Sequence, residues 1–186
     1  MNHFLSQRGQ SFGLGGNTTP SRLIKLYDLC CQLSEAQDSG INSPDDIWTE
    51  IREWLLGHSR ADVQEAVMHQ GTTRKETALH LVCEHKVPYV IIERMLAAAP
   101  IAAQLIDVNG RLPLHYASAN GADDSVLGLL VEVYPVATQM ADTKGVVPLH
   151  FALSTKGREI SPVCARVLSQ GHANSCKDEV GGMLPM

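Results

Sequence analysis

The chain has 186 residues, of which 44% are hydrophobic and 19% charged, so its composition excludes disorder throughout and allows a sizeable buried core. A formal net charge of −5 gives no general attraction to phosphate backbones or anionic membranes, and we expect no nucleic-acid partner. No apolar run approaches the ~18 residues of a membrane span, and the amino terminus lacks a signal-peptide core, so membrane insertion is not expected either.

Cysteines lie at positions 30, 31, 83, 164 and 176, without a Cys-x-x-Cys pair. An odd number of thiols without that spacing is typical of reduced, buried side chains rather than of a disulfide framework. We therefore expect a cytoplasmic protein, with the nucleus as the alternative location.

Residues 1–18 are expected to form a flexible tail. Glycines stand there among Ser, Gln and Asn, and apolar side chains are few. Such a segment cannot bury enough apolar surface to offset the conformational entropy that is lost on ordering.

Residues 19–70 are interpreted as N-terminal helices that include a degenerate first repeat or a cap. Thr19-Pro20 predicts the start of a helix near residues 20–36, and Ser43-Pro44 predicts the start of another near residues 45–56. The second helix carries both tryptophans on its apolar face. We interpret these aromatic rings as a seal over the open end of the array that follows, rather than as a ligand site.

From residue 71 onward the sequence repeats every 35 residues. The two clearest copies are DVNGRLPLHYA at 107–117 and DTKGVVPLHFA at 142–152, and a looser copy, TALHLV, stands at 77–82. A fixed period in this range is typical of a stacked array rather than of one closed globule.

Each copy predicts a pair of helices joined to the next pair by a projecting turn. The pairs are expected near residues 78–99, 113–134 and 148–170, because apolar side chains recur there at helical spacing. A proline follows the second helix of the first two pairs and prevents its continuation. The Asp-x-x-Gly sequences at 107–110 and 142–145 predict turns that project as finger tips.

Asp-x-x-Gly followed by Pro-Leu-His-x-Ala and a second amphipathic helix resembles the ankyrin repeat. The resemblance implies an all-α fold, an ankyrin-type helical solenoid of stacked helix-turn-helix repeats with finger-like turns, over residues 71–186. Three departures stand out, since Ala78 replaces the family's proline, Leu112 and Val147 replace its threonine, and Lys75 replaces its turn glycine. The family's threonine–histidine bond is therefore not expected at the second and third copies, and the first finger is expected to be irregular.

The last five residues, 182–186, match residues 110–114, so the chain ends inside a motif. We expect an array that is truncated in a further repeat. The apolar side of its last complete unit is then expected to face water and to permit self-association.

The three motif histidines, His80, His115 and His150, are interpreted as structural residues that bond backbone groups between successive repeats. One repeat corresponds to roughly 10 Å, the spacing of packed helices, which is too far for two of them to share a metal ion at ~2 Å. We expect no metal, no cofactor and no catalytic residue.

The resemblance implies a non-catalytic scaffold for protein–protein interaction, because ankyrin-like repeats generally serve in that way. The alternative is a regulatory or targeting segment of a larger enzyme or channel whose catalytic part lies beyond Met186. Arg111 is the expected energetic anchor, since arginine is enriched among residues that dominate binding. The expected partner-binding positions lie at finger tips and inner-helix ends, and they are Glu76, Glu84, His85, Asn109, Arg111, Ala119, Asn120, Lys144, Val146, Ser154 and Thr155.

Overall fold

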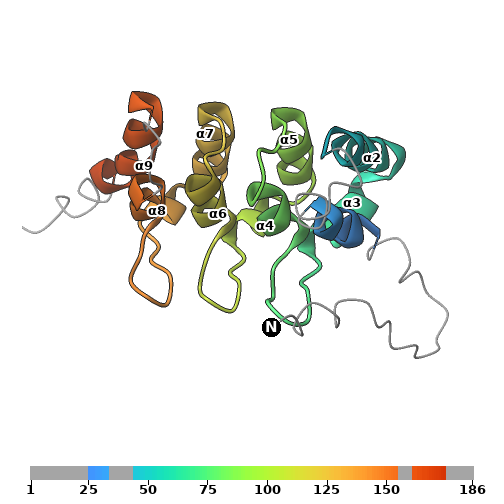
Figure 1. Ribbon diagram of the computed structural model, residues 1–186, viewed down its shortest axis with the longest axis horizontal. Helices are drawn as coiled ribbons and strands as arrows, with labels where there is room; N and C mark the ends of the chain where they lie inside the picture. Colours follow the sequence, from blue (N-terminus) through green and yellow to red (C-terminus); the bar gives the residue numbers. More distant parts are fainter. Residues whose placement is uncertain (1–24, 34–43, 155–160, 175–186) are drawn as a thin grey trace, which may run out of the picture.

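The computed structural model describes residues 25–33, 44–154 and 161–174. These residues form two layers of helices, with three loops that project from one side of the array (Figure 1). The elements after residue 43 are α2 (Pro44–Gly57), α3 (Arg60–Met68), α4 (Ala78–Cys83), α5 (Tyr89–Ala98), η1 (Pro100–Gln104), α6 (Pro113–Asn120), α7 (Asp124–Val133), η2 (Pro135–Thr138), α8 (Pro148–Ser154) and α9 (Pro162–Asn174).

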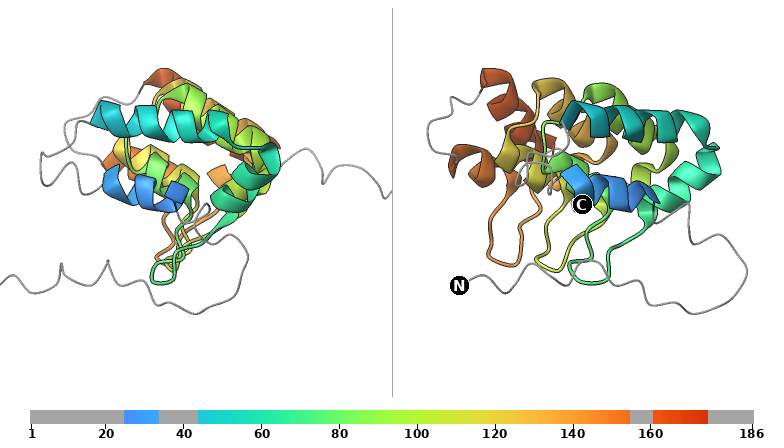
Figure 2. Two further views of the ribbon diagram at one scale, coloured as in Figure 1. Left: turned by 90° about the vertical axis from the view of Figure 1, so that its right-hand side faces the viewer. Right: turned by 45° about the vertical axis from the view of Figure 1, so that its right-hand side comes forward.

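The outer layer consists of α2, α5, α7 and α9, and the inner layer contains α4, α6 and α8. Figure 2 shows the helix of residues 25–33 beneath α2, in the inner layer. The all-α prediction is confirmed, and an isolated bridge between Gln70 and Thr77 is the β pairing found in the described part of the chain. The three predicted helix pairs agree with α4–α5, α6–α7 and α8–α9.

Two expectations concern segments outside the described residues, namely the flexible tail at 1–18 and the repeat begun at 182–186. The last complete unit, α8–α9, is described in part. On α9, Leu168 is buried while the Val163 side chain is 44% exposed.

Each of the first two outer helices in the regular repeats ends in front of a proline and continues as a short 3₁₀ helix. The residues before the prolines leave helical geometry, with Ala99 at φ −134°, ψ 73° and Tyr134 at φ −141°, ψ 82°. Proline then begins η1 and η2, because its fixed φ suits a first helical position. The sequence analysis predicted the breaks but not the 3₁₀ helices. These pack against the following outer helix, η1 on α7 and η2 on α9.

In the first unit a full helix, α3, takes the place of the 3₁₀ turn. It packs against α5 as η1 packs against α7. Ser59 begins α3 with a capping box, in which the Asp62 amide donates to the Ser59 hydroxyl over 3.2 Å and the Ser59 amide donates to the Asp62 carboxylate over 3.3 Å. The helix of residues 25–33, α2 and α3 thus form a unit of the same plan as the later repeats.

Both tryptophans lie on α2 and face the core. Trp54 is 6% exposed and stacks on His58 with 4.1 Å between ring centroids, while Trp48 is half-buried against the core. Both rings therefore pack against the core, while the interpretation that they seal the open end of the array stays a prediction.

A continuous apolar core runs between the layers, and its largest side chains include Leu79, Ile92, Met95, Leu114 and Leu127. Burial of a side chain of this kind stabilises the fold by about 1.5–3 kcal/mol relative to exposure. Because each unit contributes one side of this core and its neighbour the other, the units depend on one another for stability.

The imidazole of His80 connects the first regular repeat to the second. Its Nδ1 accepts hydrogen bonds from the Thr77 amide over 3.1 Å and the Thr77 hydroxyl over 2.9 Å, and its Nε2 donates to the carbonyl of Arg111 over 3.1 Å. An Nδ1 that accepts carries no proton, so the ring is neutral. Burial lowers the pKa of His80 to about 4, which is consistent with that state.

The two later motif histidines are bound less completely. His115 accepts at Nδ1 from the Leu112 amide over 3.0 Å, but its buried Nε2 forms no hydrogen bond of ordinary geometry with a described residue. His150 is exposed, and its Nδ1 lies 3.4 Å from the Val147 amide. Leu112 and Val147 carry no hydroxyl, so the threonine–histidine bond is found at His80 and not at these two positions.

Replacing His80 by alanine removes an interaction between repeats and leaves the buried Thr77 amide and hydroxyl without the acceptor they have in the wild type. We expect His80→Ala to lower the free energy of unfolding by about 1–3 kcal/mol. His150→Ala, at the exposed position of the same motif, is expected to change it by less than about 0.5 kcal/mol. Urea unfolding followed by circular dichroism measures both, and equal midpoints for the two variants would contradict the role assigned to His80.

The low pKa of His80 also predicts a pH dependence of stability. The unfolded imidazole takes up a proton near its ordinary pKa of 6.5, whereas the folded one does so only at about 4. The stability that this group contributes is therefore fully present above pH 6.5 and is lost as the pH falls towards 4. Between pH 7 and pH 5 the free energy of unfolding should fall by about 2 kcal/mol through His80. Urea unfolding at each pH should show a shallower fall in His80→Gln, and an equal fall would exclude His80 as the cause.

Candidate partner-binding surface

Three loops, which we call fingers, precede the inner helices α4, α6 and α8. They comprise residues 70–77 (finger 1), 105–112 (finger 2) and 140–147 (finger 3), and they project to the same side (Figure 1).

Asp107 holds the tip of finger 2 together. The Oδ1 atom of Asp107 accepts hydrogen bonds from the amides of Asn109 and Arg111, each over 2.8 Å, and Gly110 takes the left-handed conformation at φ 72°. Aspartate at the start of such a turn pairs the amides ahead of it, and glycine adopts positive φ without the steric cost of a Cβ atom.

Finger 3 repeats this arrangement, since Asp142 Oδ1 accepts from the amides of Lys144 over 2.9 Å and Val146 over 3.0 Å. Finger 1 has neither the aspartate nor the glycine. Lys75 nevertheless adopts positive φ, at 55°. The hydrogen bond at the base of finger 1 joins the Gly71 amide to the Glu76 carbonyl, so its donor lies one residue earlier in the repeat than Asp107, the corresponding donor of finger 2. The tip of finger 1 is also one residue longer, because the Lys75 amide donates to the Gly71 carbonyl four residues back over 3.1 Å, whereas the Gly110 amide donates to the Asp107 carbonyl three residues back over 3.1 Å. These differences are the irregularity expected of finger 1.

Backbone hydrogen bonds hold neighbouring fingers in a row. The Val108 amide donates to the carbonyl of Arg74 over 3.0 Å, and the Thr143 amide donates to the carbonyl of Asn109 over 2.9 Å. Each bond spans one repeat. The tips therefore form one connected surface rather than three independent loops.

Side chains add a first joint, between fingers 1 and 2, that consists of Glu76, Asp107 and Tyr116. The Tyr116 hydroxyl lies 2.9 Å from Glu76 Oε1 and 2.9 Å from Asp107 Oδ2. One hydroxyl carries one proton, so a second proton, on Glu76, is needed for both contacts to be hydrogen bonds. Arg74 approaches the Glu76 carboxylate at 3.3 Å from the solvent side.

The two carboxyl groups of the first joint differ in acidity. Burial raises the pKa of Glu76 above its ordinary value, and the hydrogen bond from Tyr116 and the charge of Arg74 only partly oppose this effect. Burial also raises the pKa of Asp107, but hydrogen bonds from Arg111, Tyr116 and Asn109 outweigh it and leave that pKa lowered. Asp107 is therefore the charged member, and Glu76 is the member that binds a proton more readily.

A second joint, between fingers 2 and 3, consists of Arg111, Asp142 and Phe151. Arg111 Nε donates to Asp142 Oδ2 over 3.2 Å, and the Arg111 guanidinium carbon lies 4.9 Å from the centroid of the Phe151 ring. Burial raises the pKa of Asp142, but hydrogen bonds from Val146, Lys144 and Arg111 outweigh it, so the net pKa is lowered.

The two joints occupy the same positions of the repeat. Arg111 follows Glu76 by 35 residues, and Phe151 follows Tyr116 by 35. A glutamate meets a tyrosine hydroxyl in the first joint, whereas an arginine meets an aromatic face in the second. The residue on the finger and the aromatic residue that it contacts therefore both differ between the two joints, and in each joint the buried polar groups have partners.

The structure leaves most of the expected partner-binding side chains accessible. Asn120, Lys144 and Ser154 are exposed, while Glu84, Asn109, Ala119 and Val146 are half-buried. Thr155 lies outside the described residues.

Two expected positions are wrong as surface residues. Glu76 is 3% exposed because it belongs to the first joint, and His85 is 7% exposed, with burial lowering its pKa. Neither side chain is available to a partner in this conformation.

Arg111, the expected energetic anchor for a partner, also has a role within the array. Its side chain is 27% exposed and already holds Asp142 and Phe151. Replacing it would change the second joint as well as any partner contact, so loss of binding in such a variant would not by itself identify a contact residue.

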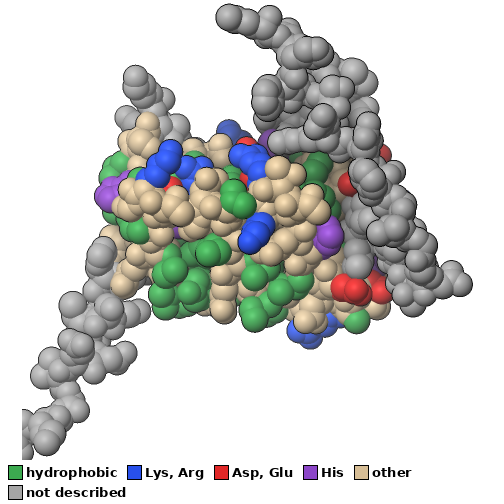
Figure 3. All heavy atoms as spheres, turned by 90° about the horizontal axis from the view of Figure 1, so that it is seen from below, with side chains coloured by type: hydrophobic (Ala, Val, Ile, Leu, Met, Phe, Trp, Pro, Cys, Tyr) green, Lys and Arg blue, Asp and Glu red, His purple; other side chains and the backbone are tan. Residues whose placement is uncertain are grey.

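The sequence analysis did not identify the exposed apolar side chains near the fingers. Val108 at the tip of finger 2 is 50% exposed, and Ile101 on η1 and Val136 on η2 are 51% and 53% exposed. The repeat register pairs Ile101 with Val136, so the signal was an apolar position that recurs outside the helical stripes. Figure 3, which views the array from the finger side, shows hydrophobic side chains gathered on this face.

The arrangement offers no metal chemistry in the described ranges, where no group of three or more His, Cys, Asp or Glu side chains is close enough to hold an ion. The described helices are also too short or too polar to cross a membrane.

The first joint predicts the effect of removing one oxygen atom. Tyr116→Phe leaves Glu76 and Asp107 without the donor between them and should lower the free energy of unfolding by about 1–3 kcal/mol. Tyr134→Phe is the matched control, because the Tyr134 hydroxyl has no hydrogen bond with a described residue. Its effect should stay below about 0.5 kcal/mol in the same urea titration. A Tyr116→Phe variant as stable as the control would show that the joint contributes nothing.

Comparison with known proteins assigns residues 48–139 to a family model described as ankyrin repeats, in three copies. A search of curated proteins finds no match. The matched segment runs from α2 through η2 and includes fingers 1 and 2, the first joint and the bond from His80 to Arg111. The family model and the all-α architecture agree, and the chain is an ankyrin repeat protein.

Proposed function

We propose that this protein is a non-catalytic scaffold that binds another protein through its finger tips and the ends of its inner helices. The observation that carries the proposal is the connected row of fingers, whose backbone is fixed by bonds across repeats while Lys144, Asn120 and Ser154 remain exposed. A surface that is ordered before binding loses little conformational entropy when a partner docks.

The side chains on this row differ between repeats. The tip position is Arg74 in finger 1, Asn109 in finger 2 and Lys144 in finger 3, whereas the leucine and histidine of the motif that follows are the same in each unit. Constant core positions keep the shape, and variable tips present different chemistry along the row. Such a row supports recognition of one particular partner.

Ankyrin repeats generally mediate protein–protein interaction, and this general role supports a protein as the partner. The net charge of −5 disfavours nucleic acid. We place the protein in the cytoplasm, in keeping with the fully buried thiols of Cys30 and Cys83.

Site-specific photo-crosslinking in cells tests the proposed surface. A photoreactive amino acid at position 144 or 120 should crosslink to a second protein, whereas the same amino acid at exposed Glu132, on outer helix α7, should not. The crosslinked species is detected by its shifted mass and identified by mass spectrometry. Crosslinking from position 132 alone would place the partner on the outer helices and contradict the proposal.

A further inference from the structure

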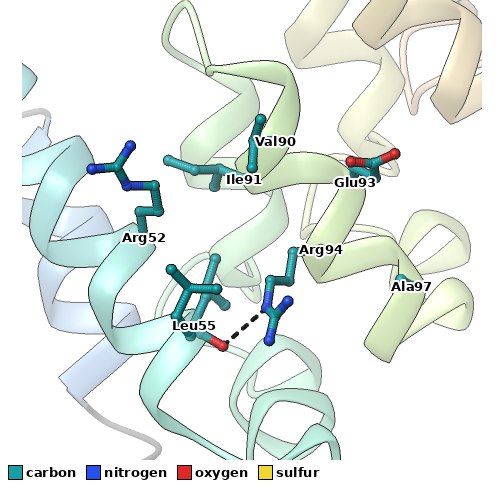
Figure 4. Close-up of a pocket in the computed structure, with 8 residues that line it drawn as sticks. Arg52, Leu55, Val90, Ile91, Glu93, Arg94 and Ala97 are labelled. Atoms are coloured by element: carbon teal, nitrogen blue, oxygen red, sulfur yellow. Dashed lines mark hydrogen bonds between the residues drawn. The ribbon is translucent and has the colours of Figure 1, made fainter.

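A groove lies between the outer helices α2 and α5 (Figure 4). Both helices belong to the layer opposite the fingers (Figure 1). Its volume is about 390 Å³, and its lining includes Leu55 and Leu56 from α2 and Val90 and Ile91 from α5. This volume falls within the range of about 300–1,000 Å³ that is typical of binding pockets.

The floor of the groove is apolar and the chain does not fill it. Leu56 is 58% exposed and Val90 is 57% exposed, although both line the same groove above the buried Leu55 and Ile91. Two large apolar side chains from different helices that face one opening form a place where a partner can bury a side chain of its own.

Two arginines border this apolar floor. Arg94 Nε donates to the carbonyl of Leu55 over 3.1 Å, which fixes the guanidinium at the last turn of α2 (Figure 4). Arg52 forms no ion pair with any residue that the structure describes. Glu93 is the single carboxylate among the lining residues, and Figure 4 draws it on the side away from Arg52.

The repeat does not require the arginine on α5. One repeat later, α7 carries Gly128 and Leu129 at the positions of Glu93 and Arg94, and Ser125 at the position of Val90. The groove chemistry therefore belongs to the first pair of outer helices and is not a general feature of the array. A fixed guanidinium beside an unpaired one suits carboxylates, which arginine binds through two parallel hydrogen bonds.

We propose that this groove binds an acidic amphipathic segment of a partner protein, with an apolar side chain on Leu56 and Val90 and neighbouring carboxylates on Arg52 and Arg94. The apolar floor selects the hydrophobic residue, and the arginines select the carboxylates on either side of it. This site is separate from the finger surface, so one scaffold holds two partner segments at once.

Selection from a random library of short peptides displayed on phage, with the whole chain as target, tests the site. Enriched peptides should combine Leu, Ile or Phe with adjacent Asp or Glu. Synthetic copies should bind the wild-type chain and lose at least about tenfold in affinity, by fluorescence anisotropy, towards Arg52→Glu and towards Val90→Asp. Both residues are exposed, so the variants should keep the wild-type melting temperature.

Two charge changes elsewhere serve as controls. Arg166→Glu alters an exposed cation on α9, and Lys144→Glu alters finger 3, so both should leave peptide affinity within about twofold of wild type. Lys144→Glu also separates this site from the finger surface, because it should weaken the finger-bound partner alone. Failure to enrich any peptide, enrichment of peptides without carboxylates, or equal affinity for Arg52→Glu would overturn the proposal.

Discussion

A neutral, buried imidazole fixes how one repeat meets the next. His80 on α4 donates to the carbonyl of Arg111, and the same carbonyl accepts from the Asp107 amide at the base of finger 2. One backbone atom thereby sets the position of a finger relative to the inner helix of the preceding unit. The Thr77 amide and hydroxyl orient the ring through Nδ1, which accepts only while the ring remains uncharged. The finger geometry therefore depends on how well the neighbouring units exclude water from this imidazole.

The joints between fingers show how a repeat can change its chemistry and keep its shape. Glu76 and Arg111 stand at equivalent positions and differ in chemistry, yet each contacts an aromatic residue of the next unit: Glu76 contacts the Tyr116 hydroxyl, and Arg111 contacts Asp142 and the Phe151 ring. Because both pairs bury polar atoms with partners, neither leaves an unsatisfied group at the joint. The surface beside each joint therefore differs between fingers, although the backbone beneath it is the same.

The sequence predicted the architecture well, because the period, the apolar stripes and the turn residues are local features that recur in each repeat. It did not predict the short helices after Pro100 and Pro135, which depend on packing against the following outer helix. It also placed Glu76 and His85 at the surface, which is wrong, and it did not reveal the contacts of Arg111 within the array. The partners of Glu76 and Arg111 lie 31 to 40 residues away, and repeat spacing does not show which side chains meet over that distance.

The backbone bonds between fingers have a geometric consequence for any protein that contacts more than one of them. Adjacent tips are separated by one repeat, roughly 10 Å for packed helices. An extended strand advances this distance in about three residues and an α-helix in about seven. A strand or helix that contacts adjacent fingers therefore has to carry its contact residues at the corresponding interval. The spacing of the fingers thus selects partners by the spacing of their contact residues as well as by the identity of those residues.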